Sequence, residues 1–421
     1  MPAFDYMNSS GIRKKQLVYV CGLGVTGALG LPQYYHPELT HPDEYSAKAA
    51  MSSTFRRLVA FTTADKIVDI ACGHGFTIVA ARVSSTSHTA LGFGLNSYSQ
   101  IGYQAARQGY PLEIVSTPLP IFLPTASPIS RVSCGRSHSL LMNTKGQIFS
   151  LGNNSFGQCG RPINEKEEYF GKKKVHLIPD LPRNICQIEC GQDHSMFLTD
   201  DGKLYSCGWG ADGQTGLGHF NNQPSPALVK GDIEGVKIVK VSSYAETVLA
   251  LDTDGNVYGW GNTEYAQFRT LTNKETKQFN TPVNLNLKNI PGKIIDIAAG
   301  GTICAILNDR GQVFVWGFGL LGKGPQVDHS SVPTLIPETL FGMNVHNPDV
   351  KVTSIRAGLS RFAAISNSGD LYMWGKNRGS ALGFAHARNQ LFPMRVNMNQ
   401  ALVRKISLGI DHSCALVEKV C

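Results

Sequence analysis

Histidines that are each followed by a serine recur along this chain and are the residues most suggestive of chemistry. Three such pairs occupy the same position of a repeat, His138-Ser139, His194-Ser195 and His412-Ser413. A serine activated by a histidine is the usual arrangement for nucleophilic catalysis. Adjacent residues on a strand point to opposite faces, so none of these serines can bond to its own histidine. The pattern favours a hydrogen-bonding role inside the fold. Contact with a partner protein, or a zinc site formed by three histidines, is the alternative.

A second motif suggests a cofactor. The segment GLGVTG at residues 22–27 matches the G-x-G-x-x-G fingerprint of dinucleotide binding. Two further segments, GWGADG at 208–213 and GFGLLG at 317–322, match it as well and in the same register. A single cofactor would not bind three equivalent segments, so we interpret these glycines as structural. The chain has no paired-carboxylate motif, Walker loop or metal-ligand spacing. We therefore predict no catalytic, cofactor-binding or metal-binding residues, and a binding protein rather than a bond-making enzyme.

The glycines that surround these motifs follow a fixed spacing. The chain has 44 glycines in 421 residues, above the usual fraction of about 7%. A first glycine is followed 11 residues later by a second and 6 residues after that by a third, in the triplets 135/146/152, 191/202/208, 300/311/317 and 358/369/375. Another copy has Tyr244 in place of the first glycine. The second glycine suits a tight hairpin turn between short apolar strands, as in Asp201-Gly202. Several strands per unit of this size indicate the blades of a β-propeller.

The two ends of the chain carry complementary halves of one repeat. Residues 405–417 supply the first half, and residues 16–30 supply a second half with no preceding partner. Pairing them would close the ring and remove exposed strand edges. The sequence thus predicts an all-β, seven-bladed β-propeller closed by N-terminal and C-terminal strands in one blade. We expect residues 1–15 to form an N-terminal tail and residues 16–421 the propeller, with long connections at 31–66, 103–128, 161–184 and 325–350.

Charge and composition limit the function further. The net charge is +8, and the ten cysteines include no C-x-x-C pair, so neither a disulfide scaffold nor a redox motif is indicated. No window of about 18 apolar residues could span a membrane. Two basic runs, Arg56-Arg57 and Lys172-Lys173-Lys174, fall in predicted connections. Solvated loops are the interpretation we favour, and contact with RNA or acidic lipid is the alternative.

The repeats resemble those of the regulator of chromosome condensation family across residues 16–421. The order CGxxHS, then DxG, then WGxNxxGQLG carries the resemblance, and CGQDHSMFLTDDGKLYSCGWGADGQTGLGH at 190–219 shows it most fully. Together with GNNSFGQCGR at 152–161 and GQVFVWGFGLLGKGP at 311–325, this segment is most similar to a mitochondrial member of the family. The resemblance implies guanine-nucleotide exchange on a dynamin-like mitochondrial fusion GTPase. It also implies mitochondrial ribosome biogenesis in association with large-subunit rRNA and its assembly factors.

The resemblance places the protein in the mitochondrial matrix or on the inner membrane face, with peripheral membrane contact open. The candidate contacts of this protein with a partner are Asp193, His194, His138, Arg361 and His412. Its candidate RNA contacts are Arg56, Arg57, Lys172, Lys173 and Lys174. The alternative function is an RNA-associated or protein-binding scaffold without exchange activity.

Overall fold

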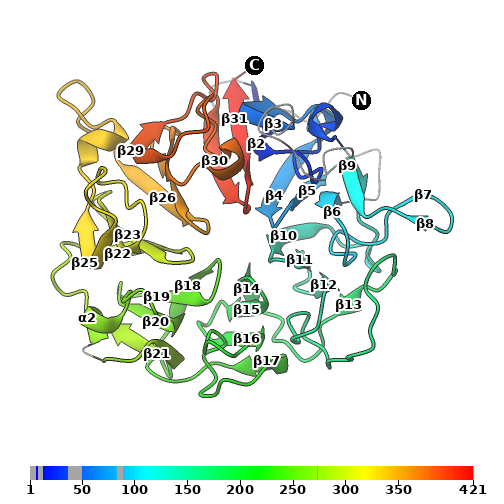
Figure 1. The fold of residues 1–421 in the computed structure, drawn as a ribbon, viewed down its shortest axis with the longest axis horizontal. Coiled ribbons are helices and arrows are strands. Elements are labelled where there is room, and N and C mark those ends of the chain that lie inside the picture. The colour runs from blue at the N-terminus through cyan, green and yellow to red at the C-terminus, as the bar shows by residue number, and fades with distance from the viewer. Residues whose placement is uncertain (1–5, 8–12, 37–49, 83–88, 273, 421) are drawn as a thin grey trace.

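Seven antiparallel sheets stand around a central axis like the blades of a propeller (Figure 1). The structure is a computed structural model, and it describes residues 6–7, 13–36, 50–82, 89–272 and 274–420. In each blade the first strand faces the axis and the fourth lies at the rim. The predicted all-β propeller is therefore confirmed.

Six blades are built from consecutive strands, which follow one another from the axis outward. Blade 1 contains β4 (Lys66–Cys72), β5 (Phe76–Arg82), β6 (Ala90–Leu95) and β9 (Ile114–Pro120). Blade 2 contains β10 (Ile129–Cys134), β11 (His138–Asn143), β12 (Ile148–Gly152) and β13 (His176–Leu177). Blade 3 contains β14 (Ile185–Cys190), β15 (His194–Thr199), β16 (Leu204–Gly208) and β17 (Gln223–Leu228). Blade 4 contains β18 (Ile238–Ser243), β19 (Thr247–Asp252), β20 (Val257–Asn262) and β21 (Gln278–Leu285). Blade 5 contains β22 (Ile294–Ala299), β23 (Ile303–Asn308), β24 (Val313–Phe318) and β25 (His329–Leu335). Blade 6 contains β26 (Val352–Ala357), β27 (Arg361–Ser366), β28 (Leu371–Gly375) and β29 (Gln390–Arg395).

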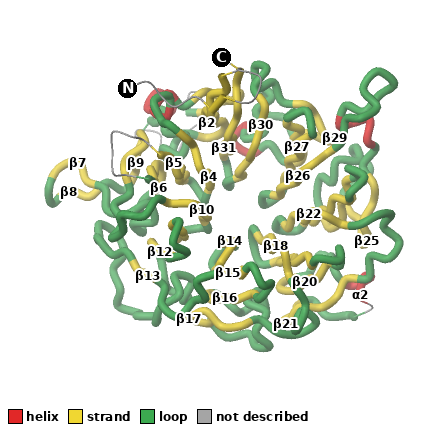
Figure 2. Tube along the Cα trace, turned by 180° about the vertical axis from the view of Figure 1, so that it is seen from behind, coloured by secondary structure: helices red, strands yellow, loops and turns green. Residues whose placement is uncertain are grey.

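Blade 7 closes the ring with strands from both ends of the chain. Its order from the axis is β30 (Leu402–Leu408), β31 (His412–Val420), β2 (Arg13–Leu23) and β3 (Met51–Arg57), with β1 (Tyr6–Met7) on β2. The register of β2 and β31 runs from Lys14 opposite Val420 to Gly22 opposite His412. Figure 2 shows β2 and β31 side by side. The predicted closure is confirmed, although β2 begins at Arg13, inside the segment expected to be a tail.

The antiparallel order gives the propeller two distinct faces. We call the face that carries the connection between the first and second strands of each blade, such as 135–137, the upper face. The turns between second and third strands, such as 144–147, lie on the lower face. A two-stranded hairpin, β7 (Ala105–Arg107) with β8 (Tyr110–Pro111), projects from the third-to-fourth-strand connection of blade 1 (Figures 1 and 2).

Short helical turns interrupt other connections of the ring. They are η1 (Pro32–Tyr34), η2 (Val59–Phe61), α2 (Arg269–Thr272), η3 (Glu338–Phe341) and η4 (Arg378–Ser380). Each is a single turn. The described parts of the long connections predicted from the sequence also contain the outer strands β3, β9, β13 and β25.

Packing between blades explains the sequence pattern of the strands. The second strand of a blade lies between two neighbouring blades, so β11, β15, β19, β23 and β27 are buried at every position. Trp260 and Trp316 are fully buried, and their indole nitrogens donate to the carbonyl oxygens of Gln214 and Gln267 in the preceding blade. The tryptophans are thus core residues that join blades.

The third glycine of each repeat is required by close backbone contact. Gly208 has φ of +110°, and a Cβ built on it would lie 2.6 Å from both the Asp193 oxygen and the His194 Cα. Gly235, in the connection after β17, has φ of +77° but no atom within 4 Å of such a Cβ. Gly208 therefore combines a left-handed backbone with a crowded Cβ position, whereas Gly235 has the left-handed backbone alone.

We expect Gly208→Ala to lower the free energy of unfolding by more than about 3 kcal/mol, because left-handed strain adds to a backbone clash. Gly235→Ala should cost only about 1 kcal/mol, from the backbone conformation alone. Urea unfolding of both variants measures the difference. Equal losses would show that crowding does not hold the third glycine in place.

Candidate functional site

The histidines at the start of the second strands reach across to the next blade. His138 on β11 lies with its Nε2 3.0 Å from the Ser195 Oγ of blade 3, and that hydroxyl donates to the Gln158 carbonyl oxygen at 2.7 Å. Because the serine proton is used there, the imidazole must donate from Nε2. His138 is fully buried, and burial lowers its pKa to about 3.

Two further histidines make equivalent contacts at other seams. His194 Nε2 lies 3.2 Å from Ser243 Oγ in blade 4, and His412 Nε2 lies 2.9 Å from Thr77 Oγ1 in blade 1. Both rings are fully buried. Burial also lowers the pKa of His194 to about 3. These histidines hydrogen-bond between blades, which is the role favoured from the sequence.

Arg361 occupies the histidine position in blade 6 and performs the same task with more bonds. Its guanidinium donates to the carbonyl oxygens of Gly409, Ile410 and His412 in blade 7, and the residue is 2% exposed. Contact of Arg361, His138, His194 and His412 with a partner protein stays a prediction. The interactions that the structure gives them are internal.

Asp193 is the candidate partner contact that lies at the upper face. It forms an ion pair of 2.5 Å with Arg136 of blade 2, whose side chain is 46% exposed, while that of Asp193 is 8% exposed. Burial raises the pKa of the Asp193 carboxyl, and Arg136 opposes that shift. A partner that approaches this face would meet the Arg136 guanidinium first and Asp193 behind it.

The first strands of the blades enclose a polar cavity of about 480 Å³ around the axis. Asp69 of blade 1 accepts from the Val132 nitrogen of blade 2 at 3.0 Å and pairs with Lys405 of blade 7. Asp296 of blade 5 repeats the pattern, with the Ile355 nitrogen of blade 6 and with Lys240 of blade 4. These residues share one repeat position, four before the first glycine or its replacement. Aligning the repeats could have revealed this ring of charges, which sequence reasoning missed.

An aromatic pair crosses the axis at the upper end of this cavity. His74 of blade 1 stacks on Tyr244 of blade 4, with ring centroids 5.7 Å apart and planes 25° from parallel. Burial raises the pKa of Tyr244, and burial together with Arg136 lowers the pKa of His74 to about 4. Tyr244 stands where other repeats have their first glycine, and its ring thus forms a contact between opposite blades.

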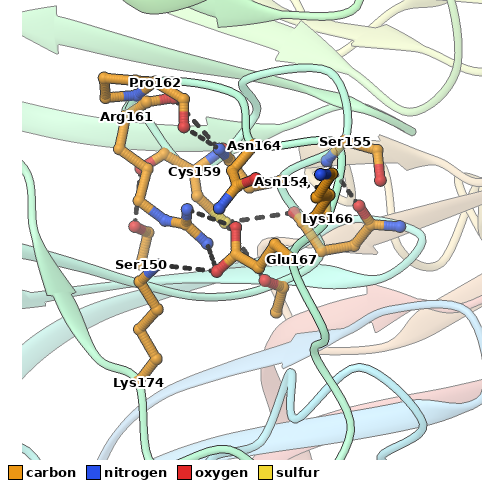
Figure 3. Close-up of polar contacts among 12 residues, drawn as sticks. Ser150, Asn154, Ser155, Cys159, Arg161, Pro162, Asn164, Lys166, Glu167 and Lys174 are labelled. Carbon is orange, nitrogen blue, oxygen red and sulfur yellow. Dashed lines mark hydrogen bonds and ion pairs between the residues drawn. The ribbon is translucent and has the colours of Figure 1, made fainter.

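The lysines of the 161–184 connection are already engaged by acidic neighbours. Glu167 lies between Arg161, at 2.6 and 2.7 Å in a bidentate pair, and Lys174, at 2.7 Å (Figure 3). The side chains of Arg161 and Glu167 are each 8% exposed. Burial opposes ionisation of Glu167, but hydrogen bonds from Arg161 and Lys174 prevail and lower its pKa. Lys172 pairs with Glu168 at 2.8 Å.

Lys173 has an aromatic partner, because its Nζ lies 4.9 Å from the centroid of the Tyr103 ring in blade 1. The three predicted RNA contacts of this loop therefore hold the connection together. Their interaction with RNA stays a prediction.

The other basic run remains open to solvent. Arg56 and Arg57 lie on the rim strand β3, opposite Val20 and Tyr19 of β2, and both side chains are exposed. Arg57 donates to Thr62 Oγ1 at 3.1 Å. The structure therefore separates the two basic runs, with Arg56-Arg57 on blade 7 and Lys172–Lys174 on blade 2.

Other chemistry is sparse in the described part of the chain. Cys21, Cys72, Cys190 and Cys207 are buried, and Cys134 is half-buried. Across residues 6–7, 13–36, 50–82, 89–272 and 274–420, no group of three or more His, Cys, Asp or Glu side chains could hold a metal ion. The helices in those residues are too short to cross a membrane.

Comparison with known proteins places this geometry in a family. Models of the regulator of chromosome condensation (RCC1) repeat match residues 129–158, 185–214 and 238–267, and residues 145–198, 201–251 and 368–416. A mouse protein called RCC1-like G exchanging factor-like protein is 42% identical over 424 residues, which cover 99% of this chain and 90% of the mouse protein. The chain belongs to the RCC1 family.

Solved RCC1-family structures share the ring. The crystal structure of human WBSCR16 has a TM-score of 0.86 at 41% identity and covers 96% of this chain and 99% of its own. Prp20p of Saccharomyces cerevisiae has a TM-score of 0.74 at 19% identity, covering 99% of this chain and 94% of its own, and that similarity concerns the fold alone. The family resemblance found in the sequence is confirmed by the nearly full-length similarity to the mouse protein and to WBSCR16.

We expect acid to destabilise the propeller through His138 and His194. Their folded pKa values of about 3 lie below the unfolded value of about 6.5, so the unfolded chain binds more protons. Stability is therefore complete above pH 6.5 and falls by about 1.4 kcal/mol per pH unit per histidine as the pH drops toward 3. Unfolding curves between pH 7.5 and pH 5 should be flatter for the double variant His138→Gln/His194→Gln, which keeps both donors. The exposed His329→Gln serves as the control, and an unchanged slope in the double variant would contradict the assignment.

We expect Glu167→Ala to open the 161–174 loop, because it leaves the buried Arg161 without its partner. Breaking a buried ion pair costs about 3–5 kcal/mol, which corresponds to at least a hundredfold faster amide exchange of the loop. Hydrogen-exchange mass spectrometry measures this. Glu168→Ala removes a carboxylate that is 80% exposed and should leave the exchange unchanged. Equal exchange in the two variants would show that the pair does not order the loop.

Proposed function

We propose that this propeller promotes guanine-nucleotide exchange on a GTPase, by holding the nucleotide-free form against one face of a closed ring. The observation that carries the proposal is the similarity, at 42% identity over almost the whole chain, to a protein named as an RCC1-like G exchanging factor-like protein. Prp20p, a family member with the same fold, is described by its binding to Gsp1p and histones. The GTPase that the sequence resemblance implies is a dynamin-like mitochondrial fusion GTPase.

The described structure suits a role that needs no bond-making residues. An exchange factor acts by binding the nucleotide-free GTPase more tightly than the nucleotide-bound form. By linkage, the exchange factor weakens the binding of the nucleotide to the GTPase. The nucleotide weakens the binding of the exchange factor by the same factor. A ring whose seams are fixed by buried hydrogen bonds offers such a partner a preorganised surface. The upper face, with Arg136 and Asp193, is the surface we assign to that contact.

A second candidate function is association with mitochondrial large-subunit rRNA during ribosome biogenesis. The observation that favours it is the exposure of Arg56 and Arg57 in a chain with a net charge of +8. Both functions place the protein in mitochondria, either in the matrix or at the inner membrane face. A protein-binding scaffold without exchange activity is the alternative to the first function.

We expect catalytic amounts of the folded protein to accelerate the release of labelled GDP from the mitochondrial fusion GTPase. Asp193→Ala should reduce the acceleration by about tenfold, as expected for a contact worth about 1.4 kcal/mol in the exchange complex. Asp254→Ala, in an exposed turn of the lower face, is the matched control and should have no effect. If GDP release with the folded wild-type protein is no faster than the spontaneous rate, exchange activity is ruled out, and an RNA-associated or protein-binding scaffold is the remaining function.

A further inference from the structure

Blades 7 and 1 carry an unbalanced positive charge where β31 meets the start of β2. We define the basic sector as the half-buried and exposed cations of these strands and of the connection between the two blades. They are Lys14, Lys15, Arg56, Arg57, Lys66, Arg82, Arg404 and Lys419. The described acidic side chains beside them are Asp65 and Glu418, and Glu418 is paired with Arg404 at 2.6 Å. Among these described side chains, cations therefore outnumber carboxylates.

Strand register brings like charges into direct opposition in this sector. Lys15 on β2 faces Lys419 on β31. Like charges placed directly opposite on neighbouring strands destabilise a sheet. No described carboxylate forms an ion pair with Lys14, Lys15 or Lys419. Among the described residues this repulsion is uncompensated, and an anionic ligand would relieve it.

The sector also results from unusually long strands. β2 has 11 residues and β31 has 9, whereas β11, β15 and β19 have 6 each. The extra length adds Lys14, Lys15 and Lys419 at the lower face, beyond what is needed to close the ring. Other blades show mixed charge on that face, as in the turn where Asp201 pairs with Lys203 at 3.1 Å.

An exposed apolar turn lies within the same sector. Val59 in η2 is 70% exposed and Ala60 beside it is exposed, while Phe61 is buried and anchors the turn. Only Leu58 separates this turn from Arg56-Arg57. An apolar tip flanked by basic side chains is the composition of surfaces that rest on anionic bilayers.

Single-stranded nucleic acid fits this surface less well than lipid, whereas contact of Arg56 and Arg57 with the backbone of folded rRNA needs no stacked bases. Proteins that bind single-stranded RNA stack its bases on exposed aromatic side chains. Within the described residues of β2, β3 and η2 the aromatic side chains Tyr19, Phe55 and Phe61 are all buried, at 6%, 6% and 2% exposure. Among these described side chains, the sector offers cations and an aliphatic tip but no stacking platform.

We propose that the basic sector docks this propeller on the surface of an anionic phospholipid bilayer. Lys14, Lys15 and Lys419 contact the headgroups, and the Val59 turn enters the interface. The docking is peripheral and reversible, and it goes beyond both functions proposed above. It leaves the upper face of the ring free.

Sedimentation with vesicles tests the proposal. The probes are vesicles of phosphatidylcholine alone and of phosphatidylcholine with phosphatidylserine at a molar ratio of about three to one, chosen to give a negative surface potential. We expect binding to the anionic vesicles only, with an affinity that falls as salt rises. Lys14→Gln/Lys15→Gln/Lys419→Gln should weaken binding by roughly a hundredfold, since each lysine near such a surface contributes a factor of about five. Val59→Ser should weaken it at every salt concentration.

A matched control removes the same charge elsewhere on the lower face. Lys237, Lys288 and Lys293 are exposed and lie in blades 4 and 5 or the connections before them, and their triple change to Gln should leave vesicle binding intact. Equal loss in both triple variants would overturn the proposal in favour of net charge. The proposal would also be overturned if the protein did not bind anionic vesicles. It would be overturned too if single-stranded RNA displaced the protein from the vesicles and the binding of that RNA depended on Lys14, Lys15 and Lys419. The Tm of the first triple variant should be unchanged or higher, which separates lost docking from lost folding.

Discussion

Close approach of the first strands around the axis is the constraint on which the rest of this structure depends. A Cβ on Gly73 would lie 2.7 Å from the Gly135 carbonyl oxygen, and one on Gly409 would lie 2.8 Å from that of Gly73. At such distances no side chain fits, so the first glycine recurs from blade to blade. The ring can depart from this rule only where a side chain is directed toward the axis. Tyr244 does so and meets His74 on the opposite side.

The same closeness decides where the polar residues of the repeat are used. Strands from different blades do not share backbone ladders, so side chains must satisfy the groups that face each seam. Ser407 accepts from the Cys72 nitrogen and Ser133 from the Cys190 nitrogen, each at 2.9 Å. The histidines, Arg361 and the buried aspartates act in the same way at other heights. The residue types that first suggest catalysis thereby join neighbouring blades.

Repetition explains both what the sequence could predict and what it could not. Gly202 and Gly208 recur at one spacing in many copies, so strand order, turn positions and ring closure followed from the sequence. Lys172 and Arg56 occur once each, and their surroundings depend on segments that no repeat specifies. Lys172 lies four residues after Glu168 and pairs with it. Arg56 instead faces solvent from the rim strand β3, which pairs with β2 across a long connection. Two basic runs that look alike in sequence therefore differ in availability.

The division into two faces allows docking and partner binding to act independently. The strands of a blade run between the faces, so a bilayer at the ends of β2 and β31 lies opposite the connections that carry Arg136 and Asp193. Seams fixed by buried hydrogen bonds keep that geometry constant, because separating two blades would expose unpaired donors and acceptors at each contact. A membrane-bound ring would thus present its upper face toward the aqueous side at a fixed height. For a GTPase anchored in the same membrane, such docking replaces a search in three dimensions by one in two, and raises the effective concentration of the partners without strengthening the contact between them.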